Sequence, residues 1–328
     1  MKVFFVDHTL SPLANEESKV LARVKVELLK FPQIQETFSP EDADALIIHE
    51  RFSFKDFRYI STLTKDPLLS RFFEKTFTIN NDDAATGLLR GLYTSLPKGR
   101  FNPDLHAAVP YMEYPNELVF SADREVPNPR YLASWRGNTK SNALRKRMVE
   151  SLGEVNGFCL ETTNSWLNHK VDEKAGYVEV MMNARFSLCP AGWAPVSFRI
   201  YESMAVGRCP VILADQLVLP SGPDWLSCAL FFPEKKVADL EAYLVERKSR
   251  YKEFGAKAEA EFNRFFADAV VAEYYAKCLV AIMCSARRTS KEAEIRRWNS
   301  LPFFWKNKWT LPQRVFNKAR KGLARVTH

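Results

Sequence analysis

Short apolar runs alternate with amphipathic segments along the first third of the chain. Residues 2–6, 45–49 and 77–80 are apolar runs of strand length, and residues 15–29 have apolar side chains at helical spacing. Strands that alternate with helices are typical of a mostly parallel, doubly wound sheet. The pattern therefore predicts an α/β domain at the N-terminal end.

A second series of elements follows a polar, proline-rich stretch over residues 102–129, which we interpret as the crossing into a second domain. Its predicted strands cover residues 131–135, 186–189 and 209–214, and its predicted helices cover 141–152 and 262–283. We expect an N-terminal Rossmann-like domain over 1–118, a second one over 119–285 and a C-terminal helix and tail over 286–328.

Residues 184–225 combine the signals of one βαβ unit. An apolar strand ends at Cys189 and Pro190, Ser197 is a suitable N-cap for the helix that follows, and Gly207 is placed to end that helix. In a parallel sheet, the N-terminus of such a helix lies at the edge where ligands bind, and its free N–H groups favour an anion such as phosphate. The segment therefore predicts an anion site.

Arg199 and Glu202 lie three residues apart in the first turns of this helix. A cation in a first turn opposes the helix dipole, so stability alone does not favour Arg199 there. A guanidinium can bind a pyrophosphate through two hydrogen bonds, and a carboxylate on the same face can accept hydrogen bonds from ribose hydroxyls. The alternative is an ordinary ion pair on the helix surface.

The same residues carry a resemblance to a known family. The sequence SFRIYESMAVGRCPVIL, with the preceding Cys-Pro-x-Gly, resembles the signature of the exostosin glycosyltransferases. The resemblance implies a GT-B fold, in which two Rossmann-like domains face each other across a cleft. It also implies a nucleotide-sugar donor, which we expect to be UDP-linked, a glycan or lipid-linked acceptor, and no separate cofactor. The residues that we assign to donor binding are Arg136, Arg185, Pro190, Gly192, Ser197, Arg199 and Glu202.

We expect no metal ion at this site. Asp42 and Asp44 form a DxD pattern, but the apolar run follows the pattern, whereas a metal-binding DxD follows its strand. In the GT-B class, positive side chains and a helix dipole stabilise the leaving nucleoside diphosphate instead. An inverting reaction also needs a base to take the proton of the acceptor hydroxyl. Among polar residues that follow predicted N-terminal strands, we assign this role to Glu50 or Asp83.

Charge is concentrated in the last part of the chain. Residues 286–328 contain twelve of the 47 lysines and arginines but only two of the 39 acidic residues, interleaved with tryptophan and phenylalanine. Such a tail favours an anionic membrane surface, and the nearly neutral remainder argues against nucleic acid. We also expect a helix near residues 292–298 to pack on the N-terminal domain.

The six cysteines have neither CxxC nor zinc-ligand spacing, so free thiols in a reducing compartment are expected. The first residues do not have the pattern of a signal peptide, and no apolar run is long enough to span a membrane. These features predict a cytoplasmic enzyme, peripheral on the inner face of the cell membrane. The alternatives are a fucosyltransferase-like GT-B enzyme that uses GDP-fucose, and a scaffold that binds nucleotide or sugar without catalysis.

Overall fold

The computed structural model describes residues 1–51, 59–83, 85–122, 126, 128–163, 171–285 and 289–301. Contacts between residues divide the chain into two compact units. Unit 1 comprises residues 1–22, 29–107 and 279–328, and unit 2 comprises 23–28 and 108–278. The crossing from one unit to the other therefore lies at 107/108, eleven residues before the boundary expected from the sequence.

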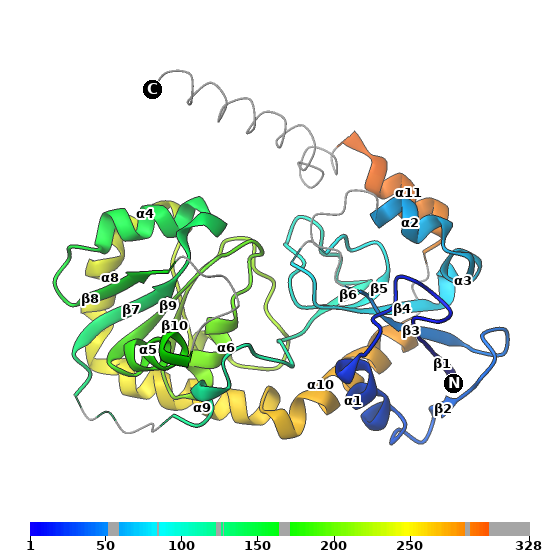
Figure 1. Cartoon of the computed structure of the whole chain (residues 1–328), viewed down its shortest axis with the longest axis horizontal. Helices are drawn as coiled ribbons and strands as arrows, with labels where there is room; N and C mark the ends of the chain where they lie inside the picture. The colour runs from blue at the N-terminus through cyan, green and yellow to red at the C-terminus, as the bar shows by residue number, and fades with distance from the viewer. Residues whose placement is uncertain are drawn as a thin grey trace. The chain divides into compact units, whose positions relative to one another are not determined.

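Unit 1 contains a six-stranded sheet with the order β2-β1-β3-β4-β5-β6 (Figure 1). The pairings from β2 through β5 are parallel, and the order reverses beside β1, as in a doubly wound sheet. Its elements, in chain order, are β1 (Lys2–Val6), the start of α1 (Lys19–Leu28), β2 (Gln35–Glu36), β3 (Ala45–His49), α2 (Tyr59–Lys65), α3 (Pro67–Arg71), β4 (Thr76–Asn80), β5 (Arg90–Tyr93), β6 (His106–Ala108) and α11 (Lys291–Asn299). Residues 23–28 of α1 and the last residue of β6 belong to unit 2.

Helix α11 returns to unit 1 from the far end of the chain. Lys291 Nζ donates to Ser70 Oγ at 2.5 Å, and Arg297 Nη2 donates to the Gly87 carbonyl at 2.8 Å. Glu294 on the same helix is buried and pairs with Arg297. The expectation that this stretch forms a helix on the N-terminal domain is confirmed.

Unit 2 contains a five-stranded parallel sheet with the order β11-β10-β9-β7-β8. Helix α4 lies on one face of this sheet, whereas α5 and α6 lie on the other (Figure 1). Its elements, in chain order, are β7 (Tyr131–Gly137), α4 (Ala143–Leu152), β8 (Phe158–Thr162), α5 (Val171–Met182), β9 (Ala184–Pro190), α6 (Phe198–Ala205), β10 (Cys209–Leu213), α7 (Trp225–Cys228), β11 (Leu230–Phe231), α8 (Leu240–Arg247), α9 (Tyr251–Phe265) and most of α10 (Asp268–Cys284), whose residues 279–284 belong to unit 1.

Both units are α/β structures whose sheets are mostly parallel and reverse in strand order, so the predicted fold class, two Rossmann-like units of the GT-B type, is confirmed. One predicted element needs correction. Residues 262–283 do not form one helical stretch, because α9 ends at Phe265 and α10 begins at Asp268. The cleft between the domains stays a prediction.

Other expectations concern the cysteines, the membrane and the tail. All six cysteines are free thiols, and Cys189, Cys209 and Cys228 are buried, as predicted. Among the helices in the described ranges, none is both long and apolar enough to cross a membrane. Residues 302–328, which contain most of the basic aromatic tail, lie outside the described residues, so its membrane role stays a prediction.

Candidate functional site

The strand order of unit 2 reverses between β7 and β9. The connection through α4 leads from β7 to β8 on one side, and the connection through α6 leads from β9 to β10 on the other. The loops after β7 and β9 therefore leave the carboxyl edge of the sheet in opposite directions, and ligands of open α/β sheets bind between such loops.

Helix α6 begins at this edge as predicted. Ser197 is its N-cap, and the Ser197 hydroxyl accepts a hydrogen bond from the Arg199 N–H at 3.4 Å. The helix ends at Ala205, and Gly207 follows with a φ of 66°, a conformation that glycine adopts without strain. Pro190 is the last residue of β9, and Gly192 lies in the loop between β9 and α6.

The Arg199 side chain lies under the surface of unit 2, with an exposed fraction of 3%. Its Nη2 donates to the Arg136 carbonyl at the end of β7, at 2.7 Å, so the side chain connects α6 to the neighbouring strand. Its Nη1 is buried and has no hydrogen-bond partner among the described residues. A buried guanidinium N–H without a partner costs free energy unless a ligand or water accepts from it.

Glu202 is 2% exposed, and Tyr177 of α5 connects it to Arg199. The Tyr177 hydroxyl donates to Glu202 Oε2, while the Arg199 guanidinium carbon lies 4.3 Å from the centroid of the Tyr177 ring. Burial raises the pKa of the Glu202 carboxyl to about 7, although the Tyr177 hydrogen bond and the Arg199 charge both lower it. Both side chains are buried, so the surface ion pair considered from the sequence is excluded.

Arg145 of α4 and Asn142, the residue that caps this helix, also hold this edge together, although neither was among the residues predicted for the site. Arg145 donates from Nε to the Ala191 carbonyl at 3.1 Å, and from its two terminal nitrogens to Pro190 and Asn138 carbonyls, each at 3.3 Å. Asn142, the N-cap of α4, donates to the Gly192 carbonyl at 3.0 Å. Arg145 therefore connects the loops after β7 and β9.

The Arg145 guanidinium approaches Gly192 closely, so a side chain at position 192 would displace it. A Cβ atom there would lie 2.8 Å from Arg145 Nη2, closer than real Cβ contacts. Arg145 shares with Arg199 the feature by which the sequence indicated Arg199: it is a cation in the first turn of a helix that follows a strand.

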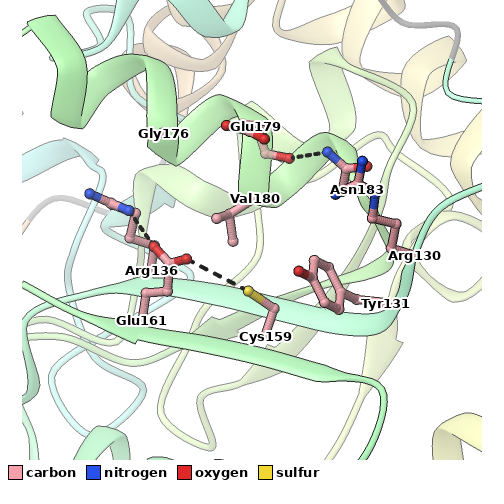
Figure 2. A pocket seen from close by; sticks show the side chains of 9 residues that line it. All are labelled: Arg130, Tyr131, Arg136, Cys159, Glu161, Gly176, Glu179, Val180 and Asn183. Carbon is pink, nitrogen blue, oxygen red and sulfur yellow. Dashed lines mark hydrogen bonds and ion pairs between the residues drawn. The ribbon is translucent and has the colours of Figure 1, made fainter.

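Arg136 contributes its carbonyl to the Arg199 contact, but its side chain extends along the sheet. The Arg136 guanidinium pairs with Glu161 of β8, whose other oxygen lies 3.8 Å from the Cys159 sulfur. Figure 2 shows these three side chains in a pocket between α5 and strands β7 and β8, with Gly176 of α5 above Arg136. The positive charge of Arg136 is thus paired with a carboxylate of the protein.

Arg185 does not lie with the other predicted donor-site residues. It is the second residue of β9, whereas Pro190 is the last, and five residues of a strand span about 16 Å. Its guanidinium carbon lies 5.8 Å from the centroid of the Tyr251 ring. Strand direction places Arg185 at the amino edge of the sheet, opposite Ser197 and Arg199.

We therefore expect Arg185→Ala to leave the affinity for a nucleoside diphosphate within about twofold of wild type, since the substituted side chain is a strand length away. Isothermal titration calorimetry with UDP measures this directly. A loss of about tenfold or more would return Arg185 to the donor site and contradict the placement argued from β9.

The two residues assigned to base catalysis lie at the carboxyl edge of the unit 1 sheet. Glu50 follows β3, is 5% exposed, and accepts a hydrogen bond from Asn80 Nδ2 at 2.6 Å. Asp83 follows β4, is partly exposed, and accepts from Ser95 Oγ at 3.3 Å. The structure thus brings both carboxylates to one edge and leaves Asp83 the more accessible.

Asp42 and Asp44 precede β3, as the sequence indicated. Asp44 Oδ2 accepts from the Lys2 N–H at 2.7 Å, so this carboxylate fixes the amino edge of the sheet. Within the described ranges, no group of three or more histidine, cysteine or acidic side chains is arranged to hold a metal ion. Metal independence itself stays a prediction.

Comparison with known proteins gives several similarities. The chain is 40% identical over 83 residues to "Probable beta-1,4-xylosyltransferase IRX10" of Arabidopsis thaliana, which covers 25% of this chain and 20% of that protein. It is 36% identical over 110 residues to "Probable glucuronosyltransferase Os03g0107900" of Oryza sativa subsp. japonica, which covers 33% of this chain and 24% of that protein. The matched region thus spans only about a quarter of these relatives.

Among solved structures, TarM of S. aureus in a complex with UDP matches at a TM-score of 0.37 and 12% identity, over 77% of this chain and 52% of that chain. The model of the exostosin GT47 domain matches residues 70–247, which include β7, α4, β9 and α6. This match covers more than half of the chain, and the chain therefore belongs to the exostosin GT47 family.

Proposed function

We propose that this protein is a glycosyltransferase that moves a sugar from a nucleotide-sugar, UDP-linked in our proposal, to a glycan acceptor. The observation that supports it most is the buried pair of Arg199 and Glu202 at the strand-order reversal of unit 2, with Arg199 Nη1 unpaired among the described residues. The family and the names of the plant relatives support the same class of reaction.

In this proposal, the donor diphosphate lies at the N-terminus of α6. The free N–H groups of the first turn and Arg199 Nη1 donate to its oxygens, and the Glu202 carboxylate accepts from the ribose hydroxyls. Arg145 and Asn142 act as positioning residues, since they hold the loops on either side of the diphosphate. No metal ion is needed, because positive groups meet the charge that develops on the leaving group.

The reaction that we propose inverts the anomeric centre. The acceptor oxygen attacks the anomeric carbon and loses its proton to a carboxylate, and the bond between that carbon and the diphosphate oxygen breaks. The nucleoside diphosphate leaves with the electron pair of that bond. We propose Asp83 as the base, because it is partly exposed and so more accessible to an acceptor than the buried Glu50.

A donor screen tests the function. We expect the purified protein to release nucleoside diphosphate slowly from one UDP-sugar, and not from GDP-fucose or a CMP-sugar, with acceleration by a xylan or related oligosaccharide. Release from GDP-fucose alone would favour the fucosyltransferase alternative. Binding of nucleotide-sugar without release under any condition would favour the scaffold.

We expect activity in this assay to survive EDTA, because Arg199 and the α6 N-terminus carry the role that a metal ion has in other transferases. The measurement is the initial rate with EDTA in excess over any metal ion and without EDTA. Complete loss with EDTA and recovery with added manganese would show that the reaction depends on a metal ion.

Asp83→Asn is expected to lower kcat by about 100-fold or more, with UDP affinity unchanged, because the amide cannot take the acceptor proton. Glu50→Gln is the matched comparison, and should lower kcat less if Asp83 is the base. The opposite order of the two kcat losses would assign the proton transfer to Glu50.

A further inference from the structure

Trp193 is exposed at the ligand-binding edge of unit 2. It lies in the loop between β9 and α6, four residues before Ser197, and 45% of its surface is accessible to solvent. The other tryptophans for which the structure gives burial, Trp135 and Trp225, are only 2% and 8% exposed. A tryptophan that is nearly half exposed forfeits part of the free energy of burial that a fully buried tryptophan gains.

Hydrogen bonds fix the backbone on both sides of Trp193. The Ala191 N–H donates to the Leu213 carbonyl at 2.9 Å, and the Gly192 N–H donates to the Ala194 carbonyl at 2.9 Å. The carbonyls of Ala191 and Gly192 accept from the side chains of α4 described above. The backbone that carries Trp193 is therefore held in place, so little backbone freedom is lost when a ligand contacts the indole.

The chemistry of the indole suits one class of ligand. The face of a pyranose ring presents C–H groups and is apolar, while its hydroxyls point outward and stay hydrated. A flat aromatic side chain covers such a face and leaves the hydroxyls free to hydrogen bond. Ligand sites combine aromatic surfaces of this kind with a few polar groups, and here Arg199 and Glu202 lie on the helix that the loop leads into.

We propose that Trp193 stacks on a pyranose ring bound at the carboxyl edge of the unit 2 sheet and contributes to sugar recognition. This proposal rests on the proposed glycosyltransferase function. The ring can belong to the donor sugar or to the acceptor glycan, and the two sources share the chemistry that the indole recognises.

The test compares Trp193→Ala and Trp193→Phe in the full chain by calorimetry. In the donor arm, affinities for UDP and UDP-xylose are measured. In the acceptor arm, the affinity for a xylo-oligosaccharide is measured without nucleotide. Trp193→Ala should weaken one sugar ligand about tenfold, with UDP changed less than twofold, and Trp193→Phe should retain most of that affinity. Loss in the first arm assigns the ring to the donor, and loss in the second assigns it to the acceptor.

Val245→Ala is the matched control, since Val245 is an apolar side chain of α8 with a similar exposed fraction, 42%. Val245→Ala should leave the affinities measured in both arms unchanged, and thermal unfolding should show that all variants remain folded. The proposal is overturned if Trp193→Ala leaves both sugar ligands unchanged, if it weakens UDP as much as UDP-xylose, or if the wild type binds no sugar ligand. Failure of the proposed function gives a different result, because the wild type would then bind neither UDP nor UDP-xylose. The affinity for the xylo-oligosaccharide, measured without nucleotide, would still show whether Trp193 contacts a sugar.

Discussion

Arg199→Lys is expected to weaken UDP binding by about 100-fold, which corresponds to about 2.7 kcal/mol. The guanidinium reaches the Arg136 carbonyl with Nη2 while Nη1 stays available to a ligand. An ammonium group keeps the charge but lacks the fork that serves both partners at once. Calorimetry with UDP measures the loss. The lysine variant is better than alanine, because a cavity beside Glu202 would also destabilise the fold.

Arg208→Lys provides the control for this experiment. Arg208 is also buried, at 8% exposure, and its Nη2 donates to the Met182 carbonyl at 3.1 Å. It immediately precedes β10, so it lies at the amino edge of the same sheet. Both variants should lose about 1 kcal/mol of stability, but only Arg199→Lys should lose UDP affinity. Equal UDP binding by the two variants would remove Arg199 from the donor site.

Glu202→Gln is expected to stabilise the ligand-free protein at alkaline pH. Burial raises the pKa of Glu202 from its ordinary value of 4.5 to about 7. The folded state therefore holds this proton more tightly than the unfolded state. The stability that the protonated carboxyl provides is fully present below pH 4.5 and is lost as the pH rises through 7. A glutamine does not titrate, so the variant should gain about 2 to 3 kcal/mol relative to wild type between pH 5 and pH 8.

Urea unfolding of both proteins at pH 5 and pH 8 measures this difference. The buried His49 and His106, whose pKa values burial lowers to about 4 and about 3, affect both proteins alike and cancel. The same variant should bind UDP more weakly while its affinity for inorganic pyrophosphate stays unchanged, because Glu202 is assigned to the ribose. A pH-independent difference in stability would mean that Glu202 titrates normally, and equal losses for UDP and pyrophosphate would refute the ribose role.

The central strands could be predicted from the sequence, because a strand buried on both faces is an unbroken apolar run. Strand β10 and most of β9 have this pattern. Strand β5 does not, since it begins with Arg90. The Arg90 guanidinium is buried because it has two partners: Nη2 donates to the Glu74 carbonyl, and the guanidinium carbon lies 4.3 Å from the Phe77 ring centroid. The sequence pattern does not show these partners, so it predicts an exposed loop residue at position 90 instead of a buried strand residue.

The donor site could be predicted only in part, for a different reason. Arg199 and Glu202 share one helix face, so their spacing places them together. Tyr177 contacts both, but it comes from another helix, and only the fold brings it to them. Arg185 shows the converse effect. It is close to Pro190 in sequence, but strand direction separates the two across the sheet.

The division of the chain also bears on the order in which the protein forms during synthesis. Residues 1–22 and 29–107 of unit 1 are made before residues 108–278, but unit 1 also includes residues from 279 onward, and α11 contacts it through Lys291 and Arg297. The main part of unit 2, residues 108–278, is complete before those residues are made. Domains usually fold in the order in which they are synthesised. Unit 1 is therefore begun before unit 2 but completed after it, so the nascent chain carries an N-terminal unit that still lacks α11 when residues 108–278 have already been made.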